Sequence, residues 1–184
     1  INELLAGYNA KDIGEKYAEV LDVFPIMKEL ADILAQNKHK RGAPQIETTE
    51  SKLIINDEDI CVDVIPRTRG ESEEIIEDFM LAANECAARF GTENGLPFVY
   101  RIHENPTDEK VEGLKEGLTK LNIPFNFNGE IKPKDLAEIL NSAKDTPKFS
   151  IVNNLVLRSM SKARYSTEPV GHFGLVLDDY AHFT

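Results

Sequence analysis

The chain has 184 residues, of which 41% are hydrophobic and 29% charged, and these are proportions of a folded globular domain. Its formal net charge of -11 argues against tight nucleic-acid binding by this stretch alone, because such binding depends on cations that neutralise phosphates. A local basic channel or bound metal ions can still reverse that field at a site. No apolar run approaches the roughly 20 residues of a membrane-spanning helix, so we expect a soluble protein.

The first part of the sequence predicts helices. Residues 1–6 form a short helical turn, and residues 12–24 and 25–39 form two helices separated at Pro25, because proline interrupts the hydrogen bonds of a helix. The second helix ends in the run 38–41, Lys-His-Lys-Arg, which suits the negative C-terminal pole of a helix dipole. These basic residues can form the C-terminal cap of the helix or contact a phosphate, and the sequence leaves both interpretations open.

A hairpin and a long helix follow. The apolar, β-rich runs 52–56 and 60–65 are separated by three acidic residues, which predicts two antiparallel strands. Residues 72–90 carry a broad apolar face at helical spacing. Glu77 and Asn84 lie seven positions apart on one side of this helix, where they can cap neighbouring loops or contact a ligand.

The next segment predicts a strand and two helices. In the strand at 96–103, alternation places Arg101 and His103 side by side on one face. That face is open to three interpretations: a solvated surface, a buried polar cluster beside a glutamate, or a patch that faces RNA. Helices are expected at 106–121, where two glycines weaken the pattern, and at 133–143.

The last segment combines a helix, a turn and a predicted strand. Residues 149–163 show the helical spacing, residues 168–171 form a turn, and apolar residues alternate over 173–177 as in a half-buried strand. This segment is dense in side chains that are frequent in functional sites: Arg158, Arg164, Tyr165, His172, Tyr180 and His182.

The sequence contains no self-sufficient active site. Asp178 and Asp179 with His182 form a carboxylate–histidine cluster, which is a weak metal signal that a turn explains equally well. A metal hydrolase that uses these three residues is the weakest hypothesis. Cys61 and Cys86 lack metal-ligand spacing, and we expect both to be buried free thiols. From the residues alone we expect an α+β fold, a mixed and mainly antiparallel sheet packed with helices.

Several segments resemble one family, the RNB exoribonucleases, and their residues are most similar to those of the bacterial ribonuclease R branch. Residues 157–184, LRSMSKARYSTEPVGHFGLVLDDYAHFT, resemble the stretch before the family's Ser-Pro-Ile-Arg-Arg-Tyr motif. Residues 62–77 resemble the hairpin that leads into its long helix, and residues 75–90 resemble that helix. Residues 97–114 resemble its strand and helix with the Tyr-Arg-x-His-Glu-x-Pro signature.

The resemblance implies an activity for the intact protein. Members degrade RNA processively from the 3′ end to nucleoside 5′-monophosphates with Mg2+, so we expect single-stranded RNA as partner, no DNA, no membrane, and a bacterial cytoplasmic location. The family's metal-binding aspartates precede these residues, and its paired arginines follow them. Residues 1–184 are therefore expected to be a partial catalytic domain that is inactive by itself. The alternative is a non-catalytic module that binds RNA or protein.

The resemblance also implies which residues contact RNA. Glu77 corresponds to a helix carboxylate near the 3′-terminal nucleotide, and the other candidates belong to the strand signature and the C-terminal segment. Residues 41–46, Arg-Gly-Ala-Pro-Gln-Ile, depart from the family's Arg-Gly-Ala-Ile-Asp-Phe and lose a carboxylate and an aromatic ring. We expect base stacking at that loop to be weakened or supplied elsewhere. The candidate RNA-binding residues are Glu77, Arg101, His103, Arg158, Tyr165, His172 and Phe173; no catalytic or metal-binding residue is expected.

Overall fold

The computed structural model describes residues 17–47, 50–67, 69–127 and 129–183. Contacts divide the chain into two compact units, the first formed by Ile1–Ile33 and Glu47–Phe79, the second by Leu34–Ile46 and Met80–Thr184. In chain order the elements are η1 (Ala18–Val20, a 3-10 helix), α3 (Val23–Lys40), β1 (Ser51–Ile55), β2 (Cys61–Pro66), α4 (Glu71–Glu93), β3 (Tyr100–Ile102), α5 (Asp108–Lys120), α6 (Pro133–Ala143), α7 (Phe149–Ser159), β4 (Arg164–Ser166) and η2 (Phe173–Leu175, also 3-10).

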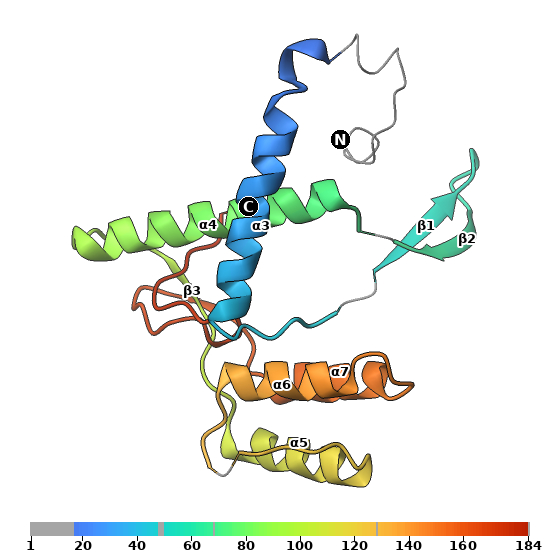
Figure 1. The fold of residues 1–184 in the computed structure, drawn as a ribbon, viewed down its shortest axis with the longest axis vertical. Helices are drawn as coiled ribbons and strands as arrows, with labels where there is room; N and C mark the ends of the chain where they lie inside the picture. The colour runs from blue at the N-terminus through green and yellow to red at the C-terminus, as the bar shows by residue number, and fades with distance from the viewer. Residues whose placement is uncertain (1–16, 48–49, 68, 128, 184) are drawn as a thin grey trace. The chain divides into compact units, whose positions relative to one another are not determined.

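The fold is α+β, as the sequence predicts (Figure 1). Its strands form two separate antiparallel pairs, β1 with β2 and β3 with β4, and a single parallel bridge joins His103 to His172. Each pair is small, and helices make up about half of the described chain. None of the helices in the described ranges is long and apolar enough to cross a membrane.

One continuous helix, α3, replaces part of the two predicted helices. It begins at Val23 and runs through Pro25, where a break was expected, so that prediction was wrong. The proline is tolerated because it lies in the first turn, where backbone amides have no partner within the helix. Before α3 the described chain forms the short 3-10 helix η1, and residues 1–16, which include the predicted turn at 1–6, lie outside the described residues.

The basic end of α3 is a C-terminal cap. Gly42 has a φ of 81°, and its N–H donates to the His39 carbonyl at 2.9 Å, while the Ala43 N–H donates to the Lys38 carbonyl at 3.4 Å. This pair of bonds closes the helix in the manner that favours glycine after the last turn. Lys38 and Lys40 in the last turn match the negative pole of the helix dipole.

The β1–β2 hairpin in the first unit is confirmed, but its surroundings differ from expectation. Leu53 pairs with Val64, and the register shifts between Ile54 and Ile55. Nearly every residue of both strands is exposed. Cys61 is therefore exposed, and so is Cys86 on α4; both are free, but the prediction that they are buried was wrong.

The core of the second unit lies between α5, α6 and α7, which lie beside one another in Figure 1. The apolar stripes predicted for these helices supply its fully buried side chains, among them Leu118, Leu136 and Val152. Gly117 on α5 has a packing role, because a Cβ there would lie 2.9 Å from Leu155 Cδ1 of α7. The glycine that weakens the helical pattern thus lets the two helices approach.

The predicted strand at 173–177 was wrong. Phe173 to Leu175 form the 3-10 helix η2, and Val176 follows with a φ of 56°. The His172 N–H donates to the Leu177 carbonyl at 2.7 Å, so the chain turns back on itself within six residues. Phe173 and Leu177 are buried because the turn folds them inward. The apolar residues that alternate in the sequence therefore reach the core from a turn and not from an extended strand.

Candidate nucleic-acid interface

The strand β3 is the centre of the candidate interface in the second unit. It pairs with β4 along one edge, in a register that places Arg101 opposite Tyr165. Along its other edge it bonds the C-terminal segment, since the Arg101 N–H donates to the Tyr180 carbonyl at 2.7 Å. Tyr100 and Ile102 point into a small core, so the intervening residue faces the other side of the sheet.

Half-buried Arg101 and exposed Tyr165 form a pair across the two strands. The guanidinium carbon lies 4.7 Å from the centre of the tyrosine ring, which is the geometry of a cation–π contact. Tyr165 is 52% exposed, so one part of its ring remains open to solvent. The pair presents a flat aromatic surface next to a positive charge, the combination that suits a nucleobase and its phosphate.

A second cross-strand pair borders the first. Arg164 of β4 donates to Glu104, with 3.1 Å between Nη2 and Oε1. This hydrogen bond lowers the pKa of Glu104 and raises that of Arg164. Sequence reasoning placed Glu104 next to Arg101 and His103, but its ionic partner comes from β4 because the antiparallel register brings that arginine to the end of β3.

His103 is not beside Arg101 on a solvated face. It is only 7% exposed, because β3 ends at Ile102 and the residues around His172 cover the next position. Its Nδ1 accepts a hydrogen bond from the Gly174 N–H at 3.3 Å, while its Nε2 is buried without a hydrogen-bond partner in the described part of the chain. Burial lowers the pKa of His103, so the ring is neutral near pH 7.

A ring cluster, in which His103, His172 and Tyr180 make edge-to-face contacts, continues from His103 toward the C-terminus. The centres of the His103 and His172 rings are 5.0 Å apart, and those of His172 and Tyr180 are 5.2 Å apart. The Tyr180 hydroxyl lies 3.3 Å from both Asn84 Nδ2 and His182 Nδ1. The ring cluster fastens the C-terminal segment to β3 and α4. Asn84 is therefore a structural contact that holds a neighbouring segment, as the capping interpretation predicted.

His172 is held neutral within this ring cluster. Burial, followed by the neighbouring His103, lowers its pKa to about 4. Its Nδ1 accepts a hydrogen bond from the Leu175 N–H at 3.2 Å, which leaves the proton of the neutral ring on Nε2. A neutral imidazole offers hydrogen bonds and a stacking surface to a ligand, but no positive charge for a phosphate.

The structure gathers five of the seven candidate residues, Arg101, His103, Tyr165, His172 and Phe173, around β3 and η2. Glu77 belongs to the first unit and forms an ion pair with Arg69. Arg158 is exposed in the last turn of α7.

The acidic residues near the C-terminus do not form a metal site. Asp179 accepts a hydrogen bond from the Thr92 hydroxyl at 2.8 Å, and His182 contacts Tyr180. Within the described ranges, no group of three or more His, Cys, Asp or Glu side chains is placed to hold a metal ion. The weakest sequence hypothesis, a metal centre built on Asp178, Asp179 and His182, is therefore not supported.

Sequence reasoning missed contacts that join distant segments. Thr92 Oγ1 lies 3.0 Å from the Tyr100 hydroxyl as well as near Asp179, and it links α4 to β3 and the C-terminal segment. Nothing in the local sequence marks this threonine, because its partners become neighbours only in the folded chain. Arg164 was noted for its chemistry, but its partner could not be chosen without the register of β3 and β4.

Comparison with known proteins identifies the family. The RNB domain family matches residues 1–184. The chain belongs to the RNB domain family. It is 42% identical to ribonuclease R of Thermotoga maritima and 38% identical to ribonuclease R 1 of Lactococcus lactis, over 92% and 100% of this chain. It spans only 24% and 22% of those two proteins.

A solved RNB protein has the same fold. The structure of Mycoplasma genitalium RNase R in complex with ribose methylated single-stranded RNA matches with a TM-score of 0.84 and 30% sequence identity. The match covers 90% of this chain and 26% of that one. The expected α+β portion of an RNB fold is thereby confirmed.

Proposed function

We propose that this RNB chain is part of a 3′-to-5′ exoribonuclease that degrades single-stranded RNA processively to nucleoside 5′-monophosphates. The observation that carries the proposal is the family match along all 184 residues, together with relatives named ribonuclease R. A protein of the same fold has been solved with single-stranded RNA, which supports RNA as the substrate class. We further propose that the full-length protein acts in the bacterial cytoplasm and does not use DNA.

In this proposal the 184 residues bind and position RNA but do not hydrolyse it. The Arg101–Tyr165 pair binds a nucleotide, with the exposed tyrosine ring stacking on a base and the guanidinium beside the phosphate. His103, His172 and Phe173 form a neutral group of edge-to-face rings at the end of β3, and Glu77 and Arg158 add contacts elsewhere along the RNA. Asn84 and Tyr180 fix the segment that carries η2.

We propose a role for magnesium only in the full-length protein. The described residues offer no cluster of ligands that fits a metal ion. We therefore propose that Mg2+ is held by residues outside this chain and assign no catalytic step to the residues described here. Residues 1–184 are accordingly proposed to be a partial catalytic domain that is inactive by itself.

The test compares the full-length protein with the 184-residue chain on a single-stranded RNA labelled at its 3′ end, in the presence of Mg2+. We expect the full-length protein to shorten the RNA from its 3′ end and release mononucleotides, and the 184-residue chain to release none. A DNA of the same sequence should remain intact. Hydrolysis by the short chain would refute the assignment of catalysis to other residues, while RNA binding without hydrolysis by the full-length protein would favour a non-catalytic module.

Substitutions in the full-length protein test the proposed contacts. Arg101→Gln should weaken RNA binding and reduce the slope of log affinity against log salt by about 0.7, the value for one phosphate contact to a single strand. Tyr165→Leu should cost about 1–3 kcal/mol of binding free energy by removing a stacking surface. Arg89→Gln is the matched control, since it removes one exposed positive charge from α4. Equal effects of Arg101→Gln and Arg89→Gln would show that only net charge matters.

A further inference from the structure

The negative charge of the chain is concentrated in the first unit. Ile1–Ile33 and Glu47–Phe79 contain 18 acidic and 6 basic residues, which gives this unit a formal charge of -12. Leu34–Ile46 and Met80–Thr184 contain 14 acidic and 15 basic residues, which gives the second unit a formal charge of +1. The net charge of -11 therefore does not prevent the second unit from presenting a basic surface to phosphates.

Four basic side chains of the second unit surround the point where the loop after α3 meets the start of α6. Gly42 of this loop packs so closely that a Cβ there would lie 3.1 Å from Lys134 Cβ. Lys40 and Arg41 directly precede the glycine, and Lys132 is the N-cap residue of α6. Each of the four lies within two residues, or about 7 Å of chain, of the contact. Lys40, Arg41, Lys132 and Lys134 together form the basic patch.

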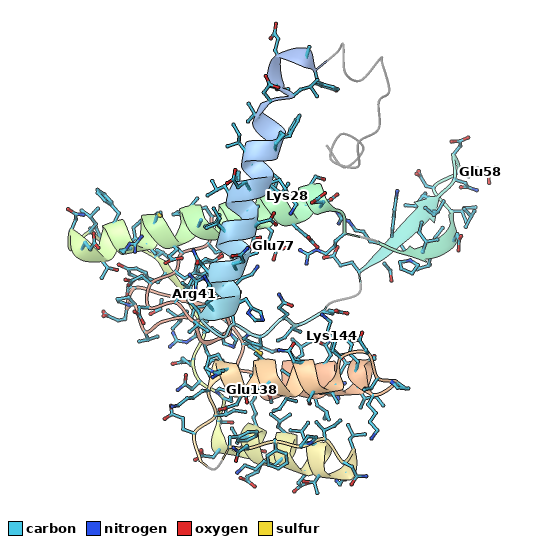
Figure 2. The ribbon with its side chains drawn as sticks, viewed as in Figure 1. Lys28, Arg41, Glu58, Glu77, Glu138 and Lys144 are labelled. Atoms are coloured by element: carbon cyan, nitrogen blue, oxygen red, sulfur yellow. The ribbon has the colours of Figure 1, made fainter. Side chains whose placement is uncertain are left out.

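The basic patch is exposed, and its ion pairs are loose. Arg41 Nη1 lies 3.8 Å from Glu85 Oε2, and Lys134 Nζ lies 3.8 Å from Glu138 Oε1. Figure 2 shows Arg41 beside the end of α3 and Glu138 on α6. Both distances are longer than a hydrogen bond, and ion pairs of this kind at the surface contribute little free energy. Within the described ranges the other two lysines of the patch form no ion pair, so all four cations are available to an anion.

The cap of α3 leaves these side chains free. It is formed by the backbone amides of Gly42 and Ala43, which donate to carbonyls in the last turn of the helix. Residues 43–46 contain no aromatic ring, Ala43 is buried, and Ile46 packs against the core of the second unit. A nucleotide that passes this loop can therefore be held by its phosphate, but not by stacking on residues 43–46.

We propose that the basic patch binds the phosphodiester backbone of single-stranded RNA through charge alone, at a place that shares no residue with the Arg101–Tyr165 pair. The inference rests on the proposed function, because it takes single-stranded RNA as the ligand. Contacts to phosphates carry no base information, so binding by the patch is independent of base sequence and strongly dependent on salt. This second contact keeps the strand on the unit when a base leaves the Tyr165 ring.

The test measures equilibrium binding of a fluorescent single-stranded RNA to the full-length protein at several salt concentrations. EDTA replaces Mg2+, so that the strand is not degraded. The patch variant combines Lys40→Gln with Lys134→Gln, and the control variant combines Lys120→Gln with Lys144→Gln in the same unit. Lys120 forms an equally loose and exposed ion pair, at 3.7 Å from a glutamate one turn away. Lys144 follows the C-terminal end of α6, as Lys40 lies at that of α3.

We expect the patch variant to bind RNA about tenfold or more weakly near about 0.1 M salt. The slope of log affinity against log salt should fall by about 1.4, which is twice the value of one phosphate contact to a single strand. Strands of different base sequence should lose affinity by the same factor. The control variant should change the affinity and the slope much less, and both variants should unfold in urea at the same midpoint. Lys134→Gln alone, a change of one exposed side chain, should reduce the slope by about 0.7.

Equal losses in the patch and control variants would overturn the proposal, and so would an unchanged slope in the patch variant. It would also be overturned if the patch variant kept its RNA affinity but lost binding to phosphatidylglycerol vesicles, because a membrane would then be the ligand. Binding in EDTA does not measure hydrolysis, so the two proposals fail in different ways. A full-length protein that binds no single-stranded RNA refutes both, whereas RNA binding that the patch variant leaves unaltered refutes the basic patch alone.

Discussion

Replacing His172 should remove much of the pH dependence of the stability of the second unit. In the folded chain burial and the nearby His103 ring lower the pKa of His172 to about 4, whereas the unfolded chain has the ordinary value of 6.5. Between these two values the unfolded state binds the proton and the folded state does not. Stability contributed by the neutral ring is therefore complete above pH 6.5 and is lost as the pH falls toward about 4.

The size of the effect follows from the two pKa values. Lowering the pH from about 7.5 to about 5 protonates His172 in almost all unfolded molecules but in few folded ones, which corresponds to roughly 2 kcal/mol. His172 retains part of its surface in solvent, and screening there reduces the expected loss to about 1–2 kcal/mol. His103 contributes in the same direction, because burial also lowers its pKa.

Urea unfolding followed by circular dichroism measures this loss in the chain and in His172→Asn. The asparagine oxygen can still accept the hydrogen bond from the Leu175 N–H, but the side chain cannot be protonated. We expect the variant to be less stable at pH 7.5 and to lose about 1–2 kcal/mol less than the original chain on going to pH 5. Carboxylates titrate in both proteins, so their contribution cancels in the comparison. Equal losses in the two proteins would refute the reasoning.

Further predictions concern glycine and cysteine positions. Gly113→Ala should raise the free energy of unfolding by about 0.5–1 kcal/mol, since an added Cβ meets no atom within 4 Å and alanine favours the helix. Gly117→Ala should gain less, because its Cβ would press against Leu155; urea unfolding of both variants measures the difference, and a larger gain at Gly117 would contradict the packing. Cys61 and Cys86 should both react with a thiol-reactive disulfide at the rate of an exposed thiol, and protection of either in the folded 184-residue chain would contradict its exposure.

Local patterns were sufficient for most of the helices. The bounds of α6 agree with the prediction for 133–143, and α4, α5 and α7 agree within a few residues. Their apolar stripes repeat every three or four residues, a property that neighbouring positions determine among themselves. The hairpin was predictable for the same reason, because three acidic residues separate two β-rich runs.

Local patterns failed where a distant segment decides the environment. His103 was expected to share the face of Arg101, but Gly174, 71 residues away, contacts its ring and buries it. The same segment was expected to be a strand because its apolar residues alternate, and it forms η2 because hydrogen bonds between His172 and Leu177 close a turn. Cys61 was expected to be buried as a strand residue, but nearly every residue of the two hairpin strands is exposed.

The sequence by itself determined the α+β class, the helices and the RNB resemblance, since these depend on residue spacing and on motifs that can be read along the chain. Only the tertiary structure decided that Arg101 lies over Tyr165, that Arg164 pairs with Glu104, and that the buried His103 and the half-buried His172 are neutral rings. The physical reason is that charge state and contact depend on which segments exclude water from a side chain. Those segments are far apart in sequence and meet through the register of two short strands and the turn that follows them.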